Sequence, residues 1–215
     1  MNSLKFLNTT TESVEYLMKK DKRLSKVINM VGEISYIPYE DSYSFLVSQI
    51  IGQMLSAKVG DVIFGRLLSL CNNKITPQTI NSLTDEELKG IGTSNSKVRF
   101  IRELTSAVID GRLNFELIET MSDTEALKYL TNIYGIGTWS AKMYLIFVLD
   151  RHDILPYEDV AFQQTYKWLY KTNDVSKEAI LKKCNKWKPY SSIASRYMYR
   201  ALDMGFTKNE FHLFK

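Results

Sequence analysis

The sequence predicts an all-α protein, and three observations carry that prediction. Apolar residues recur at helical spacing along most of the chain, as Val98, Ile101 and Val108 do, which places them on one face of a helix. Two stretches, Thr84–Glu87 and Ser122–Glu125, have the hydroxyl and carboxylate spacing of a capping box, a typical helix start. No run of alternating strand residues stands between hairpin turns, so helices are expected to supply the regular structure.

The start and stop signals place the individual helices in order. A stretch over residues 10–30 is expected to form a broken helix, and the two capping boxes open the helices expected at 85–90 and 123–133. Prolines stand at helix starts or in loops, where their missing N–H is tolerated, and glycines follow several helical stretches. The other helices are expected near 41–56, 58–71, 77–82, 95–110, 114–120, 139–149, 160–171, 176–185 and 190–204.

Size and charge limit the classes of protein that fit. At 215 residues the chain is long enough for one large domain or two small lobes that share a core. Its 45% hydrophobic and 24% charged residues are ordinary for a soluble globular protein. The net charge of +4 permits nucleic-acid binding without requiring it. An evenly charged surface explains that charge equally well.

Several functional classes lack their usual sequence signals. The first residues, "MNSLKFL", do not read as a secretory signal, and the apolar run Met143–Leu149 is far shorter than the ~20 residues that span a bilayer. A cytoplasmic protein is therefore expected. Cys71 and Cys184 are too few for an iron–sulfur cluster, and no Cys/His group has metal-ligand spacing. Two buried reduced thiols are favoured, with one disulfide as the alternative.

The four letters G-I-G-T occur twice, at Gly90–Thr93 and at Gly135–Thr138. In the second copy, one helix must end and the next begin within a few residues, which favours glycine through positive φ or close backbone approach. The amides that open the following helix can then accept a phosphate oxygen. A tight turn that binds nothing is the alternative. The two copies lie at different distances from their capping boxes, so an internal duplication does not follow.

Five stretches of the chain, in order, carry a resemblance to a known family. They are "FLVSQIIGQMLSAKVGDVIFGRL", "LKGIGTSNSKVRFIRELTSAVIDGRL", "YGIGTWSAKMYLI", "DILPYEDVAFQQ" and "WKPYSSIASRYMYRAL", and they span most of the chain from about Tyr39 to Met204. Together they resemble the helix-hairpin-helix (HhH-GPD) DNA glycosylase superfamily, most nearly its bacterial 3-methyladenine DNA glycosylase II (AlkA) type. One departure is Gln53-Met54, where many relatives have two glutamines.

The resemblance implies an all-α helix-hairpin-helix glycosylase fold, with two helical lobes and a cleft between them. It implies a single domain over residues 1–215. Its middle lobe would cover roughly 45–150, and its second lobe roughly 1–44 plus 151–215. Residues 36–41 and 151–158 are the loops expected to border the lobes. The N-terminal β-rich lobe of some relatives has no room here, since the first forty residues read as helical.

The resemblance also assigns roles to individual residues. Asp159 is the implied catalytic acid, with Glu158 and Asp153 as rivals that are expected to face solvent or cap the loop. A carboxylate there would stabilise the oxocarbenium-like state of N-glycosidic cleavage or deprotonate the attacking water. The alternative is that Asp159 only caps the next helix. Gly135, Ile136, Gly137 and Thr138 would bind the DNA backbone, and the resemblance allows a monovalent cation at the hairpin carbonyls.

Base flipping requires a pocket for the base and a wedge to fill the gap in the stack. The resemblance places Trp139, Met143 and Tyr199 in the pocket and Met54 or Leu55 at the wedge. Tyr43 and Tyr190 are further pocket candidates. For all of these residues, a place in the hydrophobic core is the alternative.

The implied function is a monofunctional base-excision glycosylase for alkylated purines such as 3-methyladenine and 7-methylguanine. Two alternatives stay open: a bifunctional glycosylase/lyase for oxidised bases, and a non-catalytic helix-hairpin-helix module that only binds DNA. Lyase relatives carry a lysine nucleophile where Trp139 stands, and Lys142 is expected at the surface or facing a phosphate. Damaged double-stranded DNA is the expected partner, the chain is expected to be a monomer, and no cofactor is expected.

Overall fold

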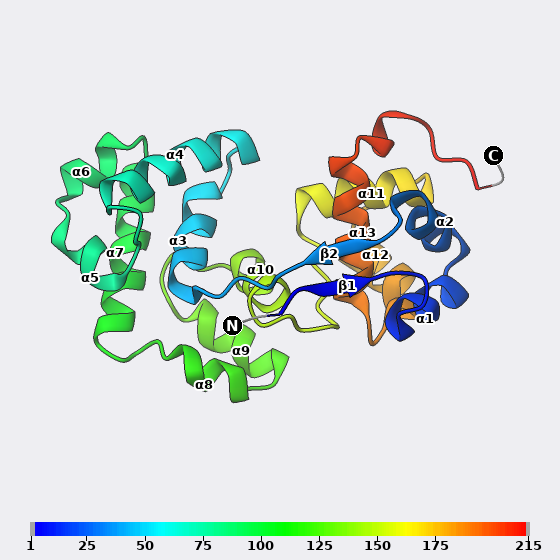
Figure 1. The fold of residues 1–215 in the computed structure, drawn as a ribbon, viewed down its shortest axis with the longest axis horizontal. Helices are drawn as coiled ribbons and strands as arrows, with labels where there is room; N and C mark the ends of the chain where they lie inside the picture. The colour runs from blue at the N-terminus through cyan, green and yellow to red at the C-terminus, as the bar shows by residue number, and fades with distance from the viewer. Residues whose placement is uncertain (1–2, 214–215) are drawn as a thin grey trace. The chain divides into compact units, whose positions relative to one another are not determined.

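The computed structural model describes residues 3–213 and divides into two compact units (Figure 1). Unit 1 consists of Met1–Pro38 with Asp150–Lys215, and unit 2 is the continuous stretch Tyr39–Leu149. Residues 1–2 and 214–215, which belong to the single domain expected from the sequence, lie outside the described range. Within that range, no helix combines the length and the apolar character needed to cross a membrane.

Unit 2 is built around α3, which contacts α4, α7 and α10. The interior of α3 is apolar because Leu46, Val47 and Ile50 are fully buried. Both predicted capping boxes are present, at the starts of α6 and α9. The helices of this unit are α3 (Ser42–Gly52), α4 (Ala57–Leu70), α5 (Pro77–Ser82), α6 (Asp85–Gly90), α7 (Asn95–Ile109), α8 (Phe115–Thr120), α9 (Asp123–Thr131) and α10 (Thr138–Phe147).

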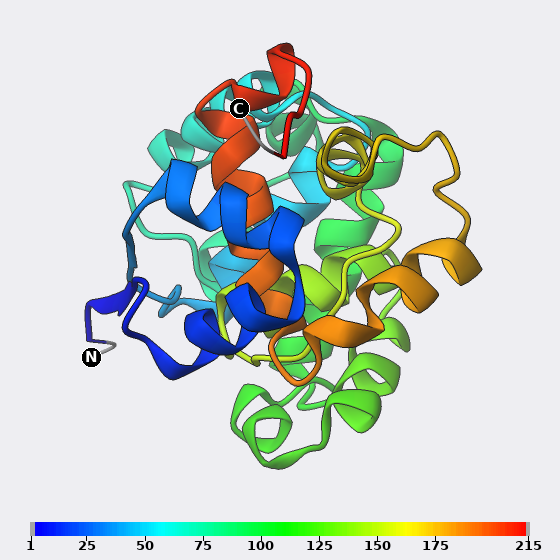
Figure 2. The same ribbon diagram turned by 90° about the vertical axis from the view of Figure 1, so that its right-hand side faces the viewer.

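Unit 1 is built around α13, which contacts α1, α2 and α11 (Figure 2). Trp187, Tyr197 and Phe162 are among its largest fully buried side chains. A two-stranded antiparallel sheet pairs Phe6 with Ser35. The elements of this unit are β1 (Lys5–Leu7), α1 (Glu12–Lys20), α2 (Lys22–Val31), β2 (Ile34–Tyr36), α11 (Val160–Tyr170), α12 (Lys177–Cys184), η1 (Asn185–Trp187), α13 (Ser191–Asp203) and η2 (Phe206–Lys208).

A buried carboxylate, Asp21, joins separate elements of unit 1. It is 2% exposed and caps α2 by accepting the amide N–H groups of Arg23 and Leu24. Its other oxygen accepts hydrogen bonds from the Tyr170 hydroxyl, from the Trp187 indole at 3.0 Å and from the Lys186 ammonium at 3.0 Å. Since Tyr170 ends α11 while the other two residues belong to η1, one side chain ties three segments together.

The structure corrects two details of the predicted elements and agrees with a third. The two short strands were not expected, because three residues are too few to show alternation. The stretch 10–30 is broken as predicted, at Asp21, between α1 and α2. The helix expected over 41–56 ends at Gly52, and Met54 has a left-handed φ of 58°. Cys71 and Cys184 are both free and buried, which agrees with the favoured interpretation of reduced thiols.

The two G-I-G-T copies form different turns. In the first copy it is the second glycine, Gly92, that takes a positive φ, of 108°. In the second copy it is the first glycine, Gly135, with a φ of 97°. The conformation falls at different places in the same four letters, so the structure gives no support to a duplicated unit.

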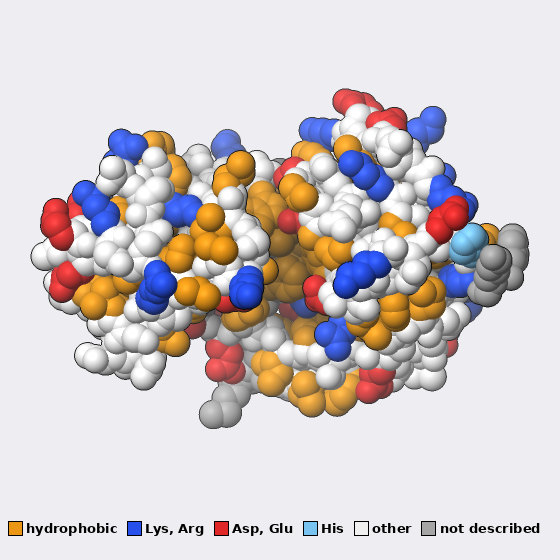
Figure 3. All heavy atoms as spheres, turned by 90° about the horizontal axis from the view of Figure 1, so that it is seen from above, with side chains coloured by type: hydrophobic (Ala, Val, Ile, Leu, Met, Phe, Trp, Pro, Cys, Tyr) orange, Lys and Arg blue, Asp and Glu red, His pale blue; other side chains and the backbone are white. Residues whose placement is uncertain are grey.

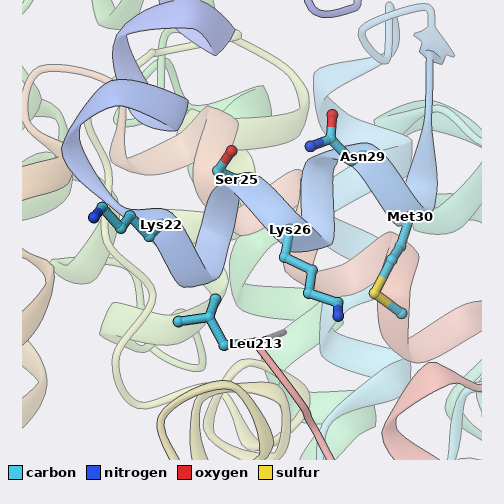
Figure 4. A pocket seen from close by; sticks show the side chains of 6 residues that line it. All are labelled: Lys22, Ser25, Lys26, Asn29, Met30 and Leu213. Atoms are coloured by element: carbon cyan, nitrogen blue, oxygen red, sulfur yellow. The ribbon is translucent and has the colours of Figure 1, made fainter. Parts of the chain in front are cut away.

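Neither the charged side chains visible in Figure 3 nor the hollow beside α2 singles out the predicted site residues. On the face that Figure 3 shows, Lys and Arg side chains are spread over both units. A hollow of about 410 Å³ lies against α2, and it contains no carboxylate and none of the predicted site residues (Figure 4). Its lining consists of Lys22, Ser25, Lys26, Asn29, Met30 and Leu213.

Candidate functional site

Asp159 stands at the start of α11 with its carboxylate fixed in place. Its Oδ1 accepts the amide N–H of Phe162 at 2.7 Å, so it is the N-cap of that helix. The residue is only 8% exposed. The loop before it is held by a hydrogen bond from Gln163 Nε2 to the Tyr157 carbonyl at 2.9 Å. A carboxylate here lies at the positive end of the α11 dipole, where a negative charge is stabilised.

Tyr199 of α13 brings a second polar group to Asp159. Its hydroxyl is buried, and its pKa responds to the Asp159 carboxylate. Burial raises the pKa of Tyr199 well above its ordinary value, and the negative charge of Asp159 raises that pKa further. The hydroxyl therefore keeps its proton at neutral pH. Asp159 thus has two neighbours in unit 1, the Phe162 amide that it caps and the protonated hydroxyl of Tyr199.

The two rival acids are placed differently. Asp153 accepts hydrogen bonds from the amide of Ser191 at 3.2 Å and from its hydroxyl at 2.5 Å, so it holds the start of α13. That is the capping role that was predicted for it as the alternative to catalysis. Glu158 is half-buried, and its charge also raises the pKa of Tyr199. Asp159 is the most buried of the three.

The hairpin in unit 2 joins α9 to α10, and its two glycines differ in what they allow. A Cβ on Gly135 would lie 2.4 Å from the Cβ of Phe100, so the positive φ and the packing both require glycine there. Gly137 has an ordinary φ of −86° and is the N-cap of α10. A Cβ on Gly137 would meet nothing within 4 Å. Its backbone is exposed and open to a ligand.

The residues between and after the glycines divide between core and surface. Ile136 is 3% exposed, so its side chain is buried and only its backbone could contact DNA. Thr138 is exposed and begins α10. The amides of the first turn of α10 have no intrahelical partner, as at any helix start. The hairpin therefore presents backbone N–H groups beside Gly137, which has no side chain to block access to them. Such an arrangement can bind a phosphate.

The predicted pocket residues fall into both units. Trp139 is half-buried in the first turn of α10, and Met143 is buried one turn later with 5% exposure. Tyr199 belongs to unit 1, beside Asp159. Of the further candidates, Tyr43 lies in the core of unit 2 with its hydroxyl 2.7 Å from Thr105 Oγ1. Tyr190 packs edge-to-face on Tyr16, with ring centroids 5.4 Å apart.

One expectation for this helix is wrong. Lys142 was expected at the surface or facing a phosphate, but it is only 6% exposed. The reason is that α10 is buried nearly all round, from Ser140 to Ile146, so its residues have little access to solvent.

The wedge candidates lie in the turn between α3 and α4. Met54 is fully exposed, at 102% of its reference area, and Leu55 is 39% exposed. They are therefore not core residues of a helix, which was the alternative for both. Sequence reasoning missed the role of Gln53 beside them, whose Nε2 donates to the Gly135 carbonyl at 3.0 Å. No periodic signal marks such a contact between residues 82 positions apart.

Comparisons with known proteins show the family to which the chain belongs. Residues 47–189 match the model of the HhH-GPD superfamily of base excision DNA repair proteins. The chain is 28% identical over 203 residues to DNA-3-methyladenine glycosylase 1 of Schizosaccharomyces pombe, covering 90% of this chain and 88% of the relative. The narrower bacterial glycosylase II type stays a prediction.

Solved structures show that the similarity in fold covers nearly all of the chain. A DNA-3-methyladenine glycosidase from Bacillus halodurans is 32% identical, with a TM-score of 0.84 over 97% of both chains. The Schizosaccharomyces pombe 3-methyladenine DNA glycosylase in complex with abasic DNA is 26% identical, with a TM-score of 0.84 over 90% of this chain and 97% of that one. The predicted all-α fold class and the predicted superfamily are thereby confirmed, and the chain belongs to the HhH-GPD superfamily of base excision DNA repair proteins.

Proposed function

We propose that this protein is a monofunctional DNA glycosylase that removes alkylated purines from double-stranded DNA by hydrolysing the N-glycosidic bond. The observation that carries the proposal is the buried carboxylate of Asp159, fixed at the N-terminus of α11, whose charge raises the pKa of the buried Tyr199 hydroxyl. It lies within the part of the chain that matches the superfamily. The similarity to DNA-3-methyladenine glycosylases supports the substrate class.

The chemistry requires little more than a fixed negative charge. A 7-methylguanine or 3-methyladenine nucleoside is cationic, so its base leaves as a neutral molecule with the electron pair of the broken bond. The deoxyribose is left with positive charge, which the carboxylate of Asp159 stabilises. Water then adds to the sugar carbon and loses its proton, for which the same carboxylate is the acceptor.

Binding is assigned to the hairpin and the neighbouring turn. In this proposal the backbone of Gly135–Thr138 holds a phosphate, Met54 or Leu55 fills the gap left by the extruded base, and Trp139, Met143 and Tyr199 contact that base. Aromatic faces attract cationic rings by about 0.5–2 kcal/mol per contact, so selectivity among alkylated purines should be broad. Both units are proposed to work as one domain in a monomer, and the protein is proposed to act on DNA in the cytoplasm.

The reaction is proposed to stop at an intact abasic site. Trp139 stands where lyase relatives have a lysine nucleophile, so no Schiff base with the sugar should form. Borohydride reduction during turnover should therefore trap no covalent adduct with DNA.

The test compares release rates from duplexes that differ in one base. They carry 7-methylguanine, 3-methyladenine, hypoxanthine, 8-oxoguanine or uracil, at one salt concentration because affinity for DNA depends on salt. The alkylated purines should be released fastest. Fastest release of 8-oxoguanine or uracil would contradict the proposed specificity, and a borohydride-trapped adduct would contradict the monofunctional mechanism.

A further inference from the structure

The side chain of Gln53 links the turn that carries Met54 to the hairpin. Gln53 is the residue that follows the last turn of α3, and its Nε2 donates to the Gly135 carbonyl at 3.0 Å. The same nitrogen lies 3.4 Å from the hydroxyl of Ser140 in α10. Gln53 therefore contacts both the hairpin and the first turn of α10. Met54, the next residue, projects fully into solvent.

The turn is also fixed at its base. Lys97 Nζ donates to the Ile51 carbonyl at 2.7 Å, near the end of α3. A Cβ on Gly60 of α4 would lie 3.4 Å from the Cα of Gly52, so the backbones of the two helices approach closely where the turn begins. Both contacts hold the ends of the turn. Between them, Met54 has a left-handed φ of 58°, which is an uncommon conformation for a side chain of this kind.

Helix α7, which contacts the end of α3 through Lys97, also contacts the hairpin through Phe100. Phe100 packs against Gly135 and lies edge-to-face on Tyr134, with ring centroids 5.0 Å apart. Phe100 follows Lys97 by three positions on α7, so one face of α7 supports the hairpin and the end of α3. The hairpin and the turn are thus both held by α7, and the hydrogen bond from the Gln53 amide to the Gly135 carbonyl joins them.

We propose that Gln53 is a positioning residue, which holds Met54 at a fixed height relative to the phosphate-binding hairpin so that the wedge enters the base stack when the hairpin binds. This inference rests on the proposed function. It assigns Gln53 no contact with the reacting atoms. Without its hydrogen bond, the hairpin still binds the backbone, but Met54 no longer lies where the extruded base leaves its gap. A small misplacement of a positioning group is enough to lower a rate about a hundredfold.

Loss of the Gln53 hydrogen bond should slow release of a paired base and spare release of an unpaired one, whereas general damage to the fold should slow both. Extrusion is costly for a paired base and cheap for one that is already unpaired. Gln53→Leu should therefore lower the single-turnover rate for 7-methylguanine paired with cytosine by about tenfold or more. The rate for the same base opposite an abasic analogue should stay within about twofold of the wild-type rate, because no pair must be broken. Affinity for undamaged duplex should not change.

The matched control is Gln49→Leu, the same substitution one turn earlier on α3. The Gln49 amide lies 3.4 Å from the hydroxyl of its own neighbour, Ser48. This variant should keep the wild-type ratio of the paired to the unpaired rate. Gln53→Glu serves as a second test variant in case Gln53→Leu folds poorly, since it keeps the size of the side chain while its carboxylate repels the Gly135 carbonyl.

A double mutant tests the link to Met54. If Gln53 acts through the wedge, Met54→Ala should give the same selective loss, and Gln53→Leu should add nothing to it. Equal loss on the paired and unpaired substrates, or full additivity with Met54→Ala, would overturn the inference. The proposed function fails separately, if the wild-type protein releases no 7-methylguanine from either duplex.

Discussion

The hydroxyl of Tyr199 is buried in unit 1, and the charge of the Asp159 carboxylate raises its pKa. The two residues come from α13 and α11, which are neighbouring helices of that unit. A helix cap alone needs no such neighbour. A protonated hydroxyl beside the carboxylate offers it a polar group and leaves its charge in place.

Tyr199→Phe should lower the rate of base release without changing DNA affinity. The variant removes the polar group whose pKa the carboxylate raises. A hydrogen bond to a charged group contributes about 1.5–3 kcal/mol, so if the hydroxyl donates to Asp159 during the reaction, the loss should be about tenfold or more. Single-turnover rates and binding to undamaged duplex would be measured on the same preparation. An unchanged rate would mean that Tyr199 does not position Asp159.

Gly137→Val should weaken binding to damaged and undamaged DNA alike. The folded protein has room for the side chain, because a Cβ at Gly137 meets nothing within 4 Å, but a phosphate could no longer approach the backbone. Since valine is a poor N-cap, Gly137→Thr is the control, with the same shape and better capping. If only the valine variant lost affinity, helix capping and not close approach would explain the result.

Gly135→Ala should destabilise the protein, by about 1–3 kcal/mol or more, because its Cβ would clash with Phe100 and its backbone would be strained. Gly111→Ala is the control for strain alone, since Gly111 also has a positive φ, of 73°, but has open space around it. Urea unfolding of both variants would compare them. Equal losses would show that the contact with Phe100 contributes nothing.

Asp21→Asn should destabilise unit 1 at neutral pH by about 2–3 kcal/mol, through weaker bonds from Lys186, Tyr170 and Trp187. Burial by itself raises the pKa of Asp21, but the hydrogen bonds from these three residues outweigh it and leave that pKa below its ordinary value. A lowered carboxylate pKa stabilises the fold above the unfolded pKa, and the contribution is lost as pH falls through the folded value. The difference between variant and wild type should therefore be constant near neutrality and shrink below about pH 4. Urea unfolding across pH measures this, and a difference that did not shrink in acid would contradict it.

Local patterns were enough to predict most of the helices. In each of the two capping boxes, Thr84 with Glu87 and Ser122 with Glu125, the partners lie three positions apart in sequence, so both helix starts could be placed correctly. The end of α3 could not, because residues 53–56 carry no stop signal. That end depends on contacts with Gly135 and Lys97, which are distant in sequence.

The candidate site was predictable to the extent that it follows short motifs. Asp159 and the hairpin glycines stand in such motifs. The influence of Asp159 on the Tyr199 hydroxyl acts between two helices and leaves no local pattern. The burial of Lys142 could not be read from its charge, because it is set by the apolar surroundings of α10.

The most direct test of the account is the single-turnover rate of 7-methylguanine release by Asp159→Asn compared with that of wild type. Asparagine keeps the size of the side chain and its ability to cap α11, but it removes the negative charge. The rate should fall by about a hundredfold or more, as for the loss of a group that acts mainly in the transition state, while affinity for DNA is unchanged. A variant that folds, binds DNA and releases the base at close to the wild-type rate would contradict the assignment of Asp159 as the catalytic residue.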